Sequence, residues 1–287
     1  MSINAKLPVR QKVQYERIDL ENGVKLAHWH RPTASLNPPF VSVLGFGQPL
    51  GPDSVIDRVD TCHSYTVDLR GAKFARAIFS RPELLLDDYV SALAGSLQEI
   101  GVENPVVEGQ SWGAAVAQRL ATQHPERLSG LVLTSASTGV GPIATTPEAL
   151  AFLTIPSQRQ RHAYSVFGDE RLRSEFLTDT EIRVIESAYE DNTANVLQSV
   201  ALMLAASALE EKSHTIDVPT MVISGTDDRL VPHADSQRLS SAIRDARFVP
   251  IEGAGHLLRL YPDAVATAIN GLLHVVDRRY RTSLHVL

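Results

Sequence analysis

One serine in this sequence stands in a pattern that suits nucleophilic chemistry. Residues 109–113 read GQSWG, a G-x-S-x-G motif that exposes a serine hydroxyl on a strained turn between a strand and a helix. Residues 105–109 are strand-like, and residues 113–124 carry an alanine-rich helical pattern. The motif therefore occurs in the context that it requires, which favours Ser111 as a nucleophile over an incidental serine in a glycine-rich turn.

A serine hydroxyl is a poor nucleophile at neutral pH, so it needs a general base and a group that orients this base. His256 is the candidate base, in the glycine-rich sequence GAGH directly after a strand-like segment. Asp228 is the candidate orienting group, in GTDDRLVP directly after another strand-like segment. Active sites of open α/β sheets gather at the carboxyl ends of strands. We therefore expect the three side chains to meet at one edge of a sheet.

The elements that must position these residues alternate along the chain. An opening hairpin turns at Asn22-Gly23, a pair that tolerates the positive φ of a tight turn. Strands that alternate with helices predict an α/β fold, a mostly parallel sheet with helices on both faces. The predicted strands are residues 13–20, 24–29, 40–45, 64–69, 105–109, 128–135, 219–225 and 247–253. The predicted helices are residues 87–101 and 113–124, one that begins near His233 and one that begins near Pro262.

Residues 138–217 contain no convincing buried strand but several helical patterns. One helical face there carries Val196, Val200, Leu204 and Ala208. We predict a helical lid of residues 138–217 inserted into a core domain of residues 1–137 and 218–287. Phe152, Leu153, Val200 and Leu204 are candidates for an acyl or aromatic pocket, although they equally suit the lid's own core.

With GQSWG, GTDDRLVP and GAGH the sequence resembles the α/β-hydrolase fold superfamily over essentially its whole length. The order Ser, Asp, His along the chain matches that of the family. The family's G-x-x-D pattern favours Asp228 over Asp227 as the acid. The stretch from Ser111 to Leu133 looks like the esterase, lipase and intracellular polyester-depolymerase branches of the family.

The resemblance also implies an oxyanion hole built from two backbone N–H groups, which by position belong to Trp112 and Phe46. Most family members carry His-Gly after the third strand, whereas this sequence has Leu44-Gly45, which leaves Gly47 as an alternative donor. Residues 68–77 also depart from the family's usual glycine and serine pattern. This second departure predicts an unusual pocket shape.

The resemblance implies a serine hydrolase that cleaves a carboxylic ester or thioester through an acyl-enzyme on Ser111, with no cofactor and no metal. The expected partner is a small acyl substrate that is partly apolar. Two alternatives stay open: an acyltransferase or biosynthetic cyclase with the same three residues, and a ligand-binding protein of this fold with little turnover. The oligomeric state is left open.

Composition narrows the class of protein further. The formal net charge of −6 argues against a general binder of nucleic acid or of anionic membranes. No run approaches the ~20 apolar residues that span a bilayer, and the first residues lack a signal peptide's apolar stretch. The single cysteine, Cys62, fits a reducing compartment, so we expect a cytoplasmic protein in which Cys62 is a buried thiol rather than a nucleophile.

His28 and His30 are two residues apart and share one face of a predicted strand, so a metal pair is conceivable there. Neither has an acidic residue or a cysteine near it in the sequence. We therefore expect both histidines to lie on the surface.

Overall fold

The computed structural model describes residues 15–32, 37–45, 48, 50, 53–69, 72, 82–137, 147–148, 151, 162, 165–169 and 213–284. These residues form an eight-stranded sheet in the order β1-β2-β4-β3-β5-β6-β7-β8. Strands β1, β2 and β4 pair antiparallel, and every other neighbouring pair is parallel. The strands are Tyr15–Asp19, Lys25–His30, Phe40–Val43, His63–Asp68, Val106–Gln110, Gly130–Thr134, Thr220–Gly225 and Arg247–Ile251.

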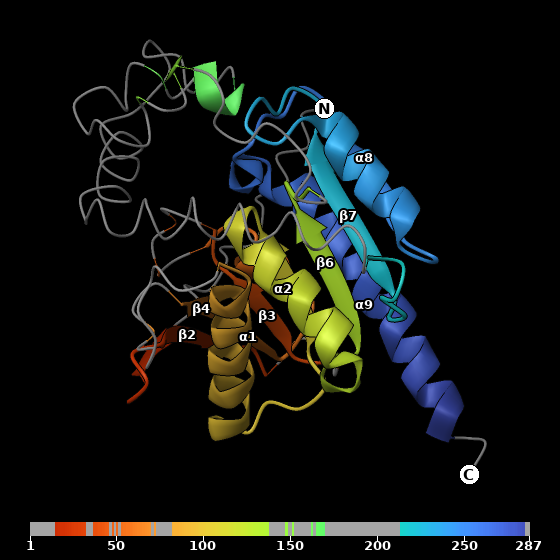
Figure 1. The fold of residues 1–287 in the computed structure, drawn as a ribbon. Helices are drawn as coiled ribbons and strands as arrows, with labels where there is room; N and C mark the ends of the chain where they lie inside the picture. The colour runs from red at the N-terminus through yellow and green to blue at the C-terminus, as the bar shows by residue number, and fades with distance from the viewer. Residues whose placement is uncertain are drawn as a thin grey trace, which may run out of the picture.

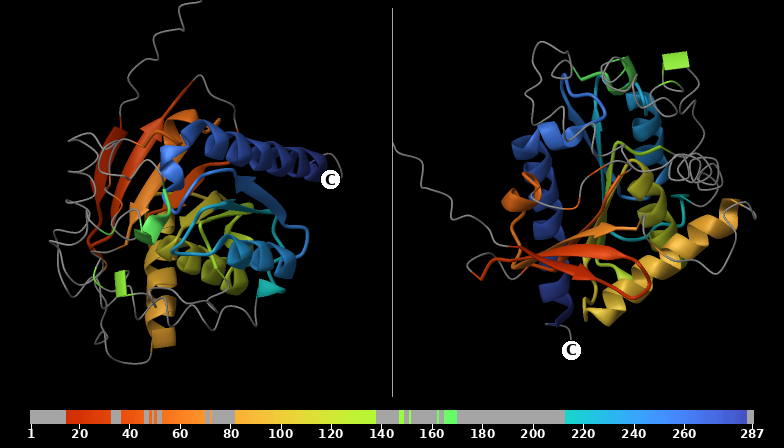
Figure 2. Two further views of the ribbon diagram at one scale, coloured as in Figure 1. Left: turned by 90° about the horizontal axis from the view of Figure 1, so that it is seen from above. Right: turned by 90° about the vertical axis from the view of Figure 1, so that its left-hand side faces the viewer.

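Helices cover both faces of this sheet, as Figures 1 and 2 show. One face packs against α1 (Pro82–Glu99), α2 (Trp112–Gln123) and α8 (His233–Ala242), and the other packs against α9 (Pro262–Leu284). Each face has its own apolar core, because alternate residues of a strand point to opposite sides. In β2, for example, Leu26 belongs to the first core and Ala27 to the second. The predicted α/β fold is confirmed.

The predicted hairpin and strands are confirmed, with differences at their ends. Gly23 has a φ of 84°, and the Asn22 side-chain oxygen accepts a hydrogen bond of 3.0 Å from the Val24 N–H. The predicted starts near His233 and Pro262 coincide with the first residues of α8 and α9.

The predicted start of the first helix at Asp87 is wrong, because α1 begins at Pro82. The Asp87 carboxylate accepts hydrogen bonds from Arg119 Nε at 2.8 Å and Gln123 Nε2 at 2.9 Å, both on α2. The side chain that suits a helix cap in the sequence is therefore bound to a neighbouring helix. The predicted end is confirmed, since Gly101 follows the helix with a φ of 70°.

Most of the predicted lid, including Phe152, Leu153, Val196, Val200, Leu204 and Ala208, lies outside the described residues. The lid and its boundaries therefore stay a prediction. The sheet does show where this segment attaches: β6 and β7, the strands before and after it, are parallel neighbours.

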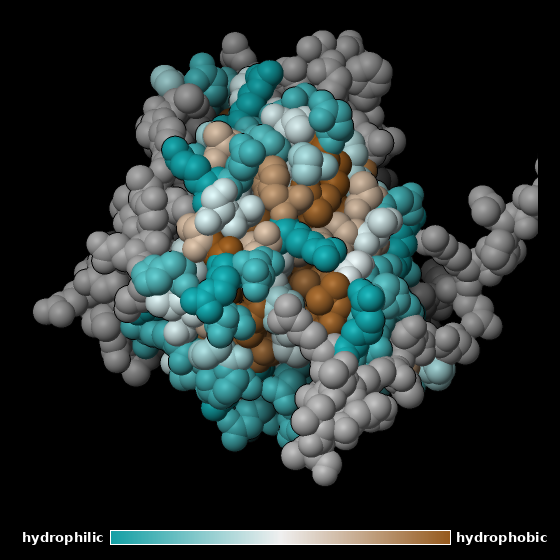
Figure 3. Space-filling view, turned by 90° about the vertical axis from the view of Figure 1, so that its right-hand side faces the viewer, coloured by the Kyte–Doolittle hydropathy of each residue, from teal (hydrophilic) through white to brown (hydrophobic). Residues whose placement is uncertain are grey.

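Strand β8 forms one edge of the sheet. Its Phe248 side chain packs partly on the α1/α2/α8 core and its Val249 side chain on the α9 core. Figure 3, which views this side of the molecule, shows apolar surface broken by hydrophilic residues. Arg247 and Pro250 are exposed on β8, and a proline and a charge at an edge oppose pairing with another strand.

Cys62 is buried, as predicted. In the part of the chain that the structure describes, no helix combines the length and the apolar character needed to cross a membrane. Among the same residues, no group of three or more His, Cys, Asp and Glu side chains is arranged to hold a metal ion.

His28 and His30 lie beside a third histidine, His63, across the antiparallel part of the sheet. His28 Nε2 lies 3.1 Å from His63 Nδ1, and the ring of His30 stacks on that of His63 with 4.7 Å between centroids. His30 is exposed, as expected, whereas His28 is half-buried because the rings of His63 and Tyr65 pack against it. Burial lowers the pKa of His28, as do His63 and His30, whereas Glu16 opposes this effect. Burial and then His30 likewise lower the pKa of His63.

These histidines should make the free energy of unfolding depend on pH. Their pKa values in the folded protein lie below the value of 6.5 expected in the unfolded chain, so the unfolded chain binds protons first as the pH falls. Their contribution is complete above pH 6.5 and is lost as the pH falls through the folded-state pKa values. Urea midpoints at about pH 7.5 and about pH 5.5 should therefore differ less in the His28→Gln/His63→Gln double variant than in the wild type.

His274→Gln is the matched control, because His274 is exposed on α9. An unchanged pH dependence in the double variant, or an equal change in the control, would contradict this assignment.

Candidate active site

Ser111 lies on a sharp turn between β5 and α2. Its backbone has φ 51° and ψ −114°, a conformation that is rare for a residue with a side chain. The Ser111 N–H donates to the Thr134 carbonyl of β6 at 2.9 Å, which ties the turn to the neighbouring strand. The strand-turn-helix context that the motif predicts is present.

The two glycines of the motif allow this turn to form. A Cβ atom at Gly109 would overlap the backbone of Gly113 and Ala114, and one at Gly113 would overlap the Val43 carbonyl oxygen of β3. The first turn of α2 therefore lies directly on β5 and β3. Trp112 is the first residue of this helix, and its ring packs edge-on against Tyr89 of α1, with 5.0 Å between centroids.

Asp228 lies in the turn that follows β7. Its Oδ1 atom accepts hydrogen bonds from the N–H groups of Leu230 at 3.0 Å and Val231 at 2.8 Å, which hold the carboxylate in place. Its neighbour Asp227 is exposed, whereas Asp228 is buried. The structure thus distinguishes the two aspartates in the way that the sequence pattern predicts.

His256 connects the serine and the aspartate. Its Nδ1 atom lies 2.9 Å from Asp228 Oδ2 and its Nε2 atom 2.9 Å from Ser111 Oγ. The imidazole is buried, with a side-chain exposure of 4%. Three residues that are far apart in the sequence therefore form one continuous row of hydrogen bonds at the carboxyl ends of β5, β7 and β8. This arrangement is able to transfer a proton from a serine hydroxyl to an imidazole that a carboxylate orients.

The structure describes one of the two candidate oxyanion donors, the Trp112 N–H. Trp112 begins α2, so its N–H has no carbonyl partner within the helix and belongs to the positive end of the helix dipole. Phe46 and the alternative donor Gly47 lie outside the described residues. Gly45, just before them, donates its N–H to Gln48 Oε1 at 2.8 Å.

Sequence reasoning missed Phe167, which comes from the segment between β6 and β7. Its carbonyl accepts a hydrogen bond of 2.7 Å from the His256 N–H, and its ring stacks on the imidazole with 5.7 Å between centroids. Gly255 permits this contact, because a Cβ atom there would overlap the Phe167 carbonyl oxygen. No local pattern around Phe167 indicates the contact.

Sequence reasoning also missed a buried ion pair close to the serine turn. Glu108 of β5 is fully buried and binds Arg259 of the 3-10 helix Leu258–Leu260, with 2.7 Å between Oε2 and Nη2. A carboxylate inside the apolar strand sequence PVVEG was an available signal, because a buried charge requires a partner.

Comparison with known proteins identifies the family. Residues 28–268, most of the chain and all three residues of the row, match the family model described as the alpha/beta hydrolase family. This chain belongs to that family.

Curated relatives of this family member include hydrolases with different substrates in their names. A 2-hydroxy-6-oxononadienedioate/2-hydroxy-6-oxononatrienedioate hydrolase of Pseudomonas sp is 25% identical over 178 residues, which are 58% of this chain and 62% of the relative. A poly(3-hydroxyalkanoate) depolymerase of Ectopseudomonas oleovorans is 27% identical over 187 residues, which are 62% of this chain and 63% of the relative. The matches thus span somewhat less than two thirds of these relatives.

Solved structures share the fold over nearly the whole chain. A hydrolase from Pseudomonas aeruginosa PA01 has a TM-score of 0.71 at 20% sequence identity, with 92% of this chain and 99% of that chain covered. At this level of identity the likeness shows the fold alone.

The space beside Gly113 is too small for a methyl group. Gly113→Ala should lower the free energy of unfolding by about 3 kcal/mol or more, because the new methyl group meets backbone that has no room to move. Gly95→Ala on α1 is the control: a Cβ atom there meets nothing within 4 Å, so this change should stabilise the protein by about 0.5–1 kcal/mol. Urea unfolding of both variants measures the difference, and equal midpoints would contradict the packing described here.

Proposed function

We propose that this member of the alpha/beta hydrolase family is a serine hydrolase that cleaves a carboxylic ester or thioester. The observation that carries the proposal is the row of hydrogen bonds from Ser111 through His256 to Asp228. Ser111 lies on a strained turn at the start of a helix, where a developing negative charge is favoured.

In the proposed first half-reaction, Ser111 Oγ attacks the acyl carbonyl carbon while its proton moves to His256 Nε2. Asp228 accepts the Nδ1–H hydrogen bond, which selects the tautomer with a basic Nε2 and stabilises the imidazolium that forms. The tetrahedral intermediate collapses when the C–O or C–S bond of the substrate breaks. His256 returns the proton to the leaving alcohol or thiol, and the acyl group stays on Ser111.

In the second half-reaction, His256 takes a proton from a water molecule that attacks the acyl-enzyme carbonyl. The bond to Ser111 Oγ then breaks, His256 protonates this oxygen, and the carboxylic acid leaves. We propose the backbone N–H groups of Trp112 and Phe46 as the donors to the oxyanion in both halves. Loss of one such donor costs about 3 kcal/mol of transition-state stabilisation.

The relatives' names define which substrates to test. One relative is named for a 2-hydroxy-6-oxononadienedioate and another for a poly(3-hydroxyalkanoate). A panel of nitrophenyl esters of short and medium chain length, a 3-hydroxyalkanoate oligomer and a 2-hydroxy-6-oxo-dienoate separates oxygen-ester from carbon–carbon cleavage. We expect turnover of the esters, with free acid as the product, whereas an acyltransferase would transfer the acyl group to an added alcohol.

Substitutions in the row provide a sharper test. Ser111→Ala should lower kcat for the best ester by about 10⁴-fold or more, and Asp228→Asn should lower it by about 10⁴-fold because the wrong imidazole tautomer is favoured. Asp227→Asn is the matched control, since Asp227 is exposed next to Asp228, and it should keep nearly full activity.

Covalent labelling tests the nucleophile without any assumption about the substrate. A fluorophosphonate should form an adduct at Ser111 of the folded wild-type protein, located by mass spectrometry, and none in the Ser111→Ala variant. Folded protein that gives no adduct, or an adduct at another serine, would contradict the proposal.

A further inference from the structure

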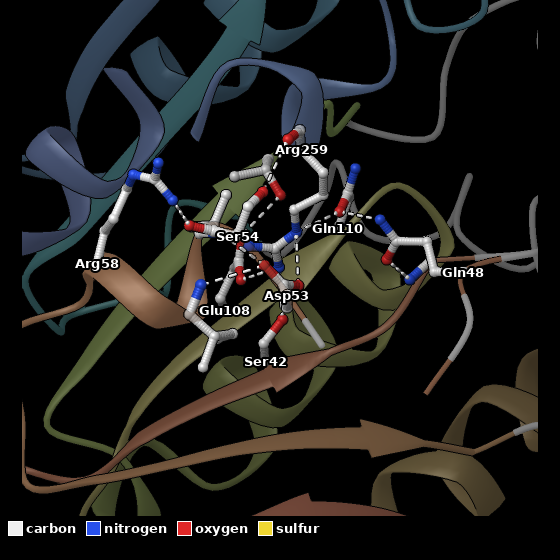
Figure 4. A network of polar contacts seen from close by, with 12 residues as sticks. Ser42, Gln48, Asp53, Ser54, Arg58, Glu108, Gln110 and Arg259 are labelled. Atoms are coloured by element: carbon white, nitrogen blue, oxygen red, sulfur yellow. Dashed lines mark hydrogen bonds and ion pairs between the residues drawn. The ribbon is translucent and has the colours of Figure 1, made fainter. Parts of the chain in front are cut away.

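A network of polar side chains, some buried and some partly exposed, includes Gln110, the residue before Ser111 (Figure 4). At its centre is the guanidinium of Arg259, whose side chain is 15% exposed. Arg259 Nη2 donates to Glu108 Oε2 at 2.7 Å and to Ser42 Oγ of β3 at 2.8 Å. Arg259 Nε lies 3.4 Å from the Asp53 carboxylate.

The network reaches the serine turn through Gln110. This buried residue directly precedes Ser111, and its Oε1 atom accepts a hydrogen bond of 3.2 Å from Arg259 Nε. The same oxygen accepts a second hydrogen bond from Gln48 Nε2. One side-chain atom next to the nucleophile therefore connects two other loops.

Gln48 extends the network to the loop that follows β3. Its side-chain Oε1 accepts a hydrogen bond of 2.8 Å from the Gly45 N–H, and its backbone N–H donates to the Gly45 carbonyl at 3.3 Å. Gly45 lies directly on the serine turn, because a Cβ atom there would stand 3.0 Å from the Gln110 carbonyl oxygen. Gly45 and Gln48 are thus both held by hydrogen bonds beside the residues that lead into Ser111.

Arg259 brings the histidine loop into the same network. It follows His256 closely, and the Leu258 N–H between them donates to the His256 carbonyl at 3.1 Å. The Arg259 carbonyl accepts a hydrogen bond of 3.3 Å from Ser54 Oγ. The side chain of Arg259 reaches β5 and β3, while its backbone belongs to the loop that carries His256.

The neighbouring carboxylates keep the Arg259 guanidinium charged. Burial alone would lower the pKa of Arg259, but Asp53 and Glu108 raise it by more than burial lowers it. A charged guanidinium has donors in a fixed planar arrangement, so it holds several partners in one geometry. Lysine has the charge but not this geometry.

We infer that Arg259 and Gln110 are positioning residues that hold Ser111 and His256 at their 2.9 Å separation by joining the loops after β3, β5 and β8. This inference rests on the proposed function, because it assigns these residues to the same reaction. Neither side chain needs to touch the substrate.

Three variants test the inference by kinetics. Arg259→Met removes the guanidinium, and Arg259→Lys keeps the charge beside Glu108 but cannot bind Gln110 at the same time. Gln110→Met leaves the Arg259–Glu108 ion pair in place and removes only the acceptor beside Ser111. Each should lower kcat for a nitrophenyl ester about 10- to 100-fold with little change in KM, because a shift of about 1 Å at reacting groups costs this much.

Arg58→Met is the matched control. Arg58 lies at the rim of the network: it donates to the Ser54 carbonyl and to Asp263, both at 2.5 Å. Neither contact involves the Arg259 guanidinium, Glu108 or Gln110, so the bonds that reach the serine turn stay in place. This control should lose thermal stability without losing kcat. In the Arg259→Lys variant the reverse is expected: a Tm close to that of the wild type with a lowered kcat.

Crystal structures of the wild type, Gln110→Met and Arg58→Met supply a readout that does not depend on ester hydrolysis. The distance from Ser111 Oγ to His256 Nε2 should exceed hydrogen-bonding range in Gln110→Met and stay unchanged in Arg58→Met. An unchanged distance in Gln110→Met, or a kcat that falls only in proportion to the folded fraction, would overturn the inference. Failure of the wild type to label at Ser111 would instead contradict the proposed function.

Discussion

At Ser111 the backbone adopts a φ of 51°. The helix after it lies so close to β5 and β3 that position 109 on β5 and position 113 on the helix have no room for a side chain. This constraint governs the rest of the site. Strand β5 must be central, because α2 rests on both β5 and β3. The serine hydroxyl then stands at the carboxyl edge of the sheet, at the positive end of a helix.

The loops after β7 and β8 approach one another in the same way. A Cβ atom at Gly225 would overlap the carbonyl oxygens of Ala254 and Gly255, so the Asp228 turn and the His256 loop lie in direct backbone contact. Gly255 in turn contacts the carbonyl of Phe167. The histidine is therefore held from one side by the sheet core and from the other by the segment that leaves the sheet between β6 and β7.

Buried charge plays a different role from apolar packing in this arrangement. Apolar contacts are non-directional, so they stabilise the layers without setting the angle between two loops. The bonds of Arg259 to Glu108 and Gln110 are directional, and they join the 3-10 helix after His256 to strand β5. A buried ion pair contributes little net stability over a well-packed apolar pair, so its value here lies in the geometry that it imposes.

The sequence by itself determined the alternation of strands and helices, the strained turn of GQSWG and the order of Ser111, Asp228 and His256, because each rests on local spacing and backbone preference. Only the tertiary structure decided the start of α1, where Asp87 binds Arg119 instead of capping the helix. It likewise decided that Glu108 meets Arg259 and that Phe167 stacks on His256. These contacts join segments far apart in the chain, and a local pattern records which residue needs a partner but not which distant residue the folded sheet brings to it.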